Sequence, residues 1–151
     1  MTERKGADGR PSAFLPTIRL VSESVRALIE AYDAAWNRQD LDALCSFHAD
    51  DVVFENHTAG ERVEGAEAVR EHIGGIFERW PTLRFRGQRL YAAGDFAVSE
   101  WTATATRDDG AVIEWEGVDV FPVRDGKIAR KDVYSNASRR MVEQLTARTR
   151  P

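Results

Sequence analysis

The sequence predicts an α+β fold in which helices lie on one side of a curved antiparallel sheet. Apolar residues recur with the period of an α-helix in the first half of the chain, most clearly over residues 24–39. After Pro81 the pattern changes to the two-residue alternation of β-strands, and Asp-Gly dipeptides at 109–110 and 125–126 indicate two tight hairpin turns. These patterns predict three helices with one early strand, followed by a four-stranded antiparallel meander.

The first helix is expected over residues 24–39, because its apolar side chains fall on one face, and Ser22 or Ser24 is a suitable N-cap. Asp40 is expected to cap a second, short helix over residues 41–48.

A strand is then expected over residues 51–56, followed by a third helix over residues 64–80 that Pro81 ends. Gly74 and Gly75 weaken the C-terminal half of that helix.

The two ends of the chain are expected to differ. Residues 1–15 are rich in charge, glycine and proline, which indicates a disordered tail before a single domain over residues 16–151. The last segment, residues 137–150, has the pattern of a C-terminal helix.

Composition argues against several classes of partner. The net charge is -4 and no basic stripe is present, so nucleic acid is not expected to bind. No apolar run approaches the roughly 18 residues of a membrane span. Cys45 is the only cysteine of the 151 residues, which fits a reducing compartment and predicts a cytoplasmic protein.

One carboxylate interrupts an apolar face. In the strand expected over residues 112–124, Asp119 shares its face with Ile113, Trp115 and Phe121. Burying an unpaired carboxylate is expensive, so Asp119 is expected to face a cavity, with a raised pKa.

Three stretches of the chain resemble the NTF2-like superfamily, over about residues 22–140. They are "YDAAWNRQDLDALCSFHADDVVFEN", "VEGAEAVREHI" and "EGVDVFPVRDGKI". Within that superfamily the chain is most similar to the SnoaL-like polyketide cyclases and their ketosteroid-isomerase relatives. The resemblance implies a cone-shaped domain, in which a curved antiparallel sheet wraps around three helices and encloses an apolar pocket.

The resemblance also implies roles for particular residues. Tyr32 and Asp119 match the oxyanion-hole tyrosine and aspartic acid of ketosteroid isomerase, and Asn56 stands where the isomerase has its general base. In the SnoaL-like cyclases the residue matching Asp119 is the acid/base, and its assisting histidine falls near Ala103 and Ala105 here. Tyr32 is therefore expected within hydrogen-bonding reach of Asp119.

The remaining site candidates come from position and side-chain type. His72, in the third helix, is a candidate base, although a lone helical histidine is more often structural. His48 and His57 are interpreted as surface residues. Lys131 lies on the strand face that families of this kind often fill with an aromatic residue, so it could face the pocket, but a surface position is favoured. Side chains expected to bind substrate or line the pocket are Asn56, Trp36, Phe54, Trp101, Trp115 and Phe121.

The sequence contains no cluster of metal ligands at suitable spacing and no glycine-rich phosphate loop, so no metal and no cofactor are expected. The favoured hypothesis is an isomerase, cyclase or dehydratase that acts by acid/base chemistry on a hydrophobic oxygenated small molecule. The alternatives are a non-catalytic small-molecule binding protein and a dimeric scaffold module. Val118 and Val120 leave apolar surface on the outer sheet face, which predicts a homodimer.

Overall fold

The computed structural model describes residues 14–140. The tail expected over residues 1–15 therefore lies almost wholly outside the described residues, as does most of the predicted C-terminal helix. Residues 137–140, where that helix is expected to begin, are helical.

Three helices precede the meander, as expected: α1 (Phe14–Arg38), α2 (Leu41–Ser46) and α3 (Ala66–Arg79). The prediction that Ser22 or Ser24 caps α1 is wrong, because both residues lie inside this helix. The cap of α2 is confirmed, since Asp40 Oδ1 accepts a hydrogen bond from the Ala43 N–H at 3.0 Å.

Six strands form one sheet in the order β2-β1-β6-β5-β4-β3. Every neighbouring pair is antiparallel except β1 with β6, which is parallel. The meander is confirmed, but β2 was not predicted, because four residues with one apolar side chain show no readable alternation. The strands are β1 (His48–Asn56), β2 (Glu61–Glu64), β3 (Arg84–Ala92), β4 (Phe96–Thr106), β5 (Val112–Arg124) and β6 (Lys127–Ser135).

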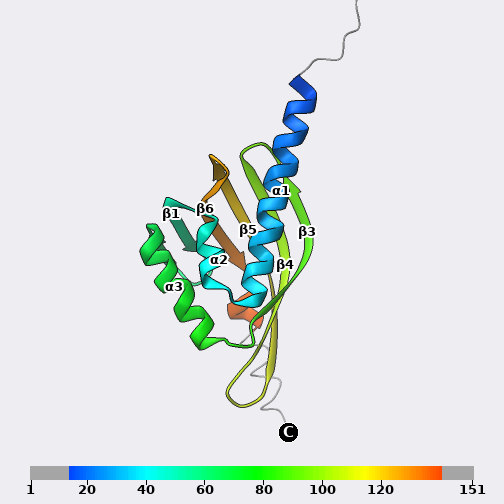
Figure 1. Cartoon of the computed structure of the whole chain (residues 1–151). Coiled ribbons are helices and arrows are strands. Elements are labelled where there is room, and N and C mark those ends of the chain that lie inside the picture. The colour runs from blue at the N-terminus through cyan, green and yellow to red at the C-terminus, as the bar shows by residue number, and fades with distance from the viewer. Residues whose placement is uncertain (1–13, 141–151) are drawn as a thin grey trace, which may run out of the picture.

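All three helices lie on one face of this curved sheet (Figure 1), which is the α+β cone that the sequence predicts. Helix α1 packs along β3 and β4, and α3 packs against β1. No helix within residues 14–140 is long and apolar enough to cross a membrane.

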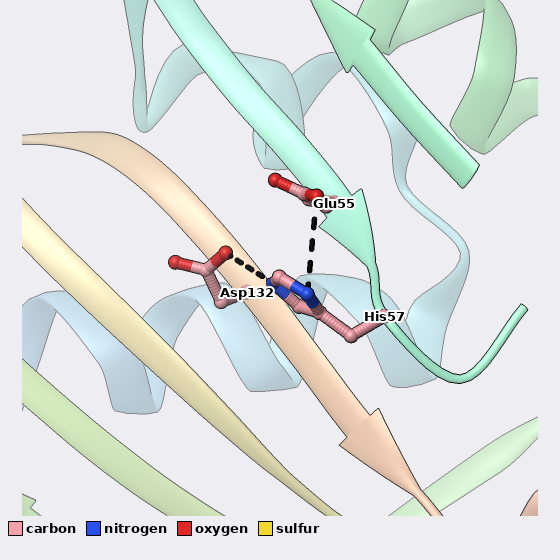
Figure 2. Close-up of side chains that lie close together, drawn as sticks. All are labelled: Glu55, His57 and Asp132. Carbon is pink, nitrogen blue, oxygen red and sulfur yellow. Dashed lines mark hydrogen bonds and ion pairs between the residues drawn. The ribbon is translucent and has the colours of Figure 1, made fainter. Parts of the chain in front are cut away.

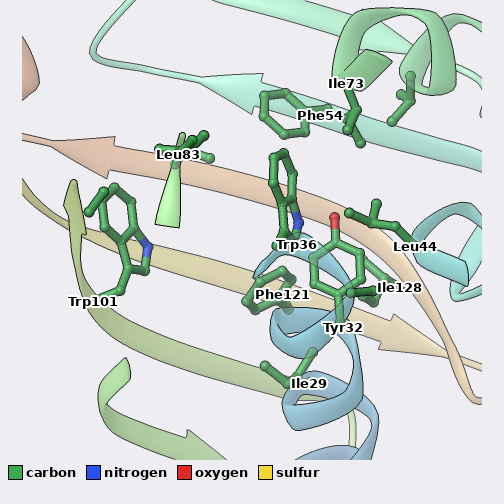
Figure 3. Close-up of a cluster of buried hydrophobic side chains, with 14 of the residues drawn as sticks. Ile29, Tyr32, Trp36, Leu44, Phe54, Ile73, Leu83, Trp101, Phe121 and Ile128 are labelled. Atoms are coloured by element: carbon green, nitrogen blue, oxygen red, sulfur yellow. The ribbon is translucent and has the colours of Figure 1, made fainter. Parts of the chain in front are cut away.

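Successive turns of α1 supply the centre of the core. Ile29, Tyr32 and Trp36 project from one side of the helix toward the sheet (Figure 3), where they are almost completely buried. The same spacing that predicts the helix therefore brings its aromatic residues to the inner face of the sheet.

Candidate functional site

A cavity of about 570 Å³ opens between α3, the C-terminal end of α1 and the inner face of the sheet. Trp36, Phe54, Trp101 and Trp115 line it, so most of the predicted apolar wall is present. Phe121 does not line it, because its side chain is fully buried beneath Tyr32, with ring centroids 5.7 Å apart.

A close backbone contact positions one of these walls. The Trp101 ring lies directly over Gly117, its partner on β5, where a Cβ atom would overlap the ring and lie 2.8 Å from the Tyr134 carbonyl oxygen. Glycine at this position lets the indole ring approach the strand closely, at the edge of the cavity.

Asp119 lines the cavity and has a partner that the sequence interpretation missed. Lys131 Nζ lies 3.0 Å from Asp119 Oδ2, and both side chains are only about 5% exposed. The prediction that Lys131 is a surface residue is wrong. Asp119 faces Val133 on β6, so Lys131, two residues earlier, projects to the same side.

Aromatic rings surround the Lys131 ammonium. Its Nζ atom lies 4.4 Å from the Trp36 ring centroid, and 5.3 to 5.7 Å from those of Tyr32, Phe121 and Phe54. Ring faces attract a cation, and the attraction grows when both groups are desolvated. The rings and the carboxylate therefore both favour a charged Lys131.

The Asp119 carboxyl is under opposing influences. Burial raises its pKa, as the sequence predicts, while the Lys131 ammonium, its hydrogen bond and the Trp101 indole N–H act to lower it. Its Oδ1 atom has no hydrogen-bond partner among residues 14–140 and remains able to accept a proton or a hydrogen bond from a ligand.

Tyr32 is bonded to a histidine rather than to Asp119. Its hydroxyl lies 3.0 Å from Nε2 of His48, which is 6% exposed, so the surface interpretation of His48 is wrong. Burial raises the pKa of Tyr32 well above its usual value, and burial together with Lys131 lowers the pKa of His48 to about 4. Both groups are neutral near pH 7, and neither lines the cavity.

The two remaining predicted residues do line the cavity. His72 packs on Phe54, with ring centroids 5.1 Å apart, and its Nε2 atom lies 3.8 Å from Glu61 Oε2. Asn56 uses its side-chain oxygen to accept the Ala59 N–H at 3.1 Å, which stabilises the turn after β1.

The cavity wall also offers hydrogen-bond donors. The indole N–H groups of Trp36 and Trp101 are buried and make no hydrogen bond of good geometry within residues 14–140, although they lie close enough to Tyr32 and Asp119, respectively, to lower the pKa of each. Unmade hydrogen bonds of this kind are costly, so they favour a ligand that brings an acceptor oxygen.

Another cluster of titratable side chains, on the outer face of the sheet, is an ion-pair network (Figure 2). His57, exposed as predicted, lies with Nε2 2.8 Å from Asp132 Oδ1 and with Nδ1 3.8 Å from Glu55 Oε1. The two ring nitrogens of His57 therefore lie near different carboxylates, and Arg130 forms ion pairs with both acids. Arginine neutralises the carboxylates here, so the arrangement needs no cation to explain it.

Comparisons with known proteins agree with this architecture. Residues 29–131 match the sequence profile of the SnoaL-like domain. None of the curated proteins matches the chain.

Solved structures give the same picture. A candidate polyketide cyclase from Xanthomonas campestris pv. campestris is 26% identical, with a TM-score of 0.66, over 79% of this chain and 95% of that one. A candidate ketosteroid isomerase from Kribbella flavida is 23% identical, with a TM-score of 0.63, over 76% and 78%. TerC, co-crystallised with polyporic acid, is 19% identical, with a TM-score of 0.71, over 81% and 97%.

Proposed function

Because the chain belongs to the SnoaL-like domain family, we propose that it is a cofactor-free enzyme that transfers protons on a hydrophobic, oxygenated small molecule. The substrate class is a polyketide-like or steroid-like ring, and the reaction is an isomerisation, a cyclisation or a dehydration. The polyketide cyclase and ketosteroid isomerase descriptions of similar structures support this class. The observation that carries the proposal is the buried Asp119–Lys131 pair in the cavity wall.

The arrangement suits removal of a proton next to a carbonyl group. Asp119 Oδ1 accepts the proton from carbon, and the C–H electron pair moves to the carbonyl oxygen to give an enolate. The Lys131 ammonium and the indole N–H of Trp101 stabilise that oxygen, which is the role that the resemblance implied for Tyr32. Return of the proton to another carbon completes an isomerisation. Attack of the enolate on a second carbonyl, whose oxygen takes the proton back from Asp119, gives a cyclisation. Departure of a β-hydroxyl as water, with that same proton, gives a dehydration.

Binding without chemistry is the alternative. The position of Tyr32 favours it, because this hydroxyl is bonded to His48 and lies outside the cavity, away from any bound oxygen. The apolar walls and unpartnered donors would then only select a ligand. An activity assay separates the two functions.

We expect Asp119→Asn to slow proton exchange on a small ketone by roughly 10²-fold or more, because it removes the base. The probe is 2-tetralone, a bicyclic ketone with acidic C–H groups, and the measurement is deuterium incorporation from D₂O by NMR. The assay is run at a temperature where circular dichroism shows both proteins folded.

The matched control is Glu116→Gln, the same kind of change at an exposed position of β5. It should keep the wild-type exchange rate. If 2-tetralone binds to the wild type but exchanges no faster than in buffer, the protein is a binder of such molecules and the proposed chemistry is wrong.

We further propose that two copies pair through the outer sheet face, which no described helix covers (Figure 1). The strand register places Val98 opposite Val120, and Val118 opposite Tyr134, so apolar side chains of three strands form one patch, which Glu100 and Asp132 border. Tyr134 is 48% exposed. Such a patch suits a symmetric, self-complementary contact.

Light scattering at micromolar concentration is expected to give the mass of a dimer for the wild type. Val120→Glu should give a monomer with unchanged circular dichroism, because it buries a charge in the contact. A monomeric wild type contradicts the proposed dimer.

A further inference from the structure

A second, smaller chamber of about 260 Å³ reaches the Asp119–Lys131 pair from the other side. It lies between α1 and the sheet, and Asp33 and Asn37 of α1 line it together with Asp119 and Lys131. The pair is therefore accessible from two separate spaces.

A row of aromatic side chains divides the two spaces. Trp36, Phe85 and Trp101 line both of them. The ring centroids of Trp36 and Phe85 are 5.7 Å apart, and those of Phe85 and Trp101 are 5.2 Å apart. An apolar ligand in the larger cavity would thus leave the smaller chamber to water, and its volume holds several molecules at about 30 Å³ each.

Asp33 lines the smaller chamber but not the larger one. Asp33, Asp119 and Lys131 together make a group of two carboxylates and one ammonium. If all three were ionised, the group would carry a net negative charge where solvation is poor. One added proton makes the group neutral, which burial favours. Because Lys131 directly contacts Asp119, Asp33 is the better place for that proton.

The pKa of Asp33 agrees with placing the added proton on this residue. Burial raises the pKa of Asp33 to about 6, with Asp119 adding to the rise, whereas Lys131 and a hydrogen bond to Ser99 oppose it. Glu30, one turn earlier on α1, has the smallest influence. Asp119 Oδ1, buried and unpartnered, provides the other end of the path.

We propose that the smaller chamber is a water-filled proton path and that Asp33 passes protons between solvent and the Asp119–Lys131 pair. The inference rests on the proposed function, because the proton in question is the one that Asp119 takes from substrate. After Asp119 has taken a proton from substrate, Asp33 releases the proton that it holds to solvent, and the resulting Asp33 carboxylate takes the Asp119 proton through chamber water. The same steps in reverse return a proton to Asp119 when a substrate must be protonated. Asp33 is a relay residue that does not touch the substrate.

The first test follows the carboxyl groups by ¹³C NMR as the pH is varied, without any substrate. Asp33 is expected to titrate with a midpoint near 6. Asp119→Asn should lower that midpoint, because it removes a like charge near Asp33 and makes Asp33 the carboxylate that interacts with the Lys131 ammonium. Glu30→Gln, an exposed acid on the same helix, is the matched control and should leave the midpoint near 6. An Asp33 that titrates near 3.9, or that ignores Asp119→Asn, overturns the proposal.

The second test uses deuterium exchange on 2-tetralone. Asp33→Asn should lower kcat about tenfold with KM unchanged, and formate, a small acid that fits the chamber, should restore part of the rate. A merely structural role would change KM or stability and would not respond to formate. An unchanged kcat overturns the proposal. If the wild type exchanges no deuterium, the proposed function fails, and the NMR titration alone decides whether Asp33 and Asp119 share a proton.

Discussion

Lys131→Met is expected to lower the free energy of unfolding by about 3–5 kcal/mol at pH 7, because it leaves the buried Asp119 carboxylate without a counter-charge. Asp119→Asn should lower it by less, because Asp33 still interacts with the Lys131 ammonium. Both side chains are almost fully buried and lie 3.0 Å apart. The double variant should recover at least half of the loss of either single variant, since it buries no net charge. Urea unfolding of the four proteins measures the coupling.

The pH dependence of the two single variants should have opposite signs. In Lys131→Met the lone Asp119 carboxyl has a folded-state pKa above its unfolded value, so its loss of stability is present near pH 7 and fades as the pH falls toward 4. In Asp119→Asn the ammonium has lost its bonded carboxylate and keeps only the weaker influence of Asp33, so its loss of stability fades as the pH rises toward 10. Additive losses with parallel pH curves would mean that the two groups do not interact as a pair.

The expected loss of stability in Asp119→Asn is the opposite of what the sequence alone suggests. With Lys131 interpreted as a surface residue, Asp119 is a lone buried acid, and Asp119→Asn should leave stability unchanged or raise it. A bonded lysine changes the sign, because the variant then leaves a cation behind. Stability therefore says little about whether Asp119 is catalytic, and the exchange assay is needed for that.

The helices, the meander and the inward position of Asp119 were readable because each rests on local periodicity. Lys131 was harder to place. Alternation along the strand from the buried Ile128 would place Lys131 on the outer face of the sheet. The β5–β6 register shifts between Val120 and Val123, however, and Ile128 and Lys131 are both buried. Counting back from Val133 would have placed the lysine inside, but a sequence does not show which count holds.

His48 and Asp33 were missed for a different reason. Each is a polar residue whose environment depends on a distant segment: His48 on Tyr32 of α1, and Asp33 on the pair contributed by β5 and β6. No local pattern encodes such contacts. The parallel pairing of β1 with β6 is likewise made by segments far apart in the chain, and it was not predicted.

His48 should make the fold sensitive to mild acid. Its folded-state pKa is lowered to about 4, whereas an unfolded histidine titrates near 6.5. As the pH falls through this window the unfolded chain binds the proton first, so stability falls, by up to about 3 kcal/mol between pH 7 and pH 4. The raised pKa of Asp33 acts in the opposite direction between about pH 4 and 6, so the two effects must be separated by comparing variants.

His48→Gln isolates the histidine, because glutamine can still bond to the Tyr32 hydroxyl but cannot take the proton. The variant is expected to lose stability at pH 7, where the ring packs against Tyr32 with centroids 5.4 Å apart, and to approach or exceed the wild type at pH 4. Urea unfolding at both values gives the difference, and long-range ¹H–¹⁵N spectra report the charge of the ring directly. Parallel curves for the two proteins, or a His48 ring that titrates near 6.5, would show that solvent reaches this histidine and that it is not the neutral core partner of Tyr32.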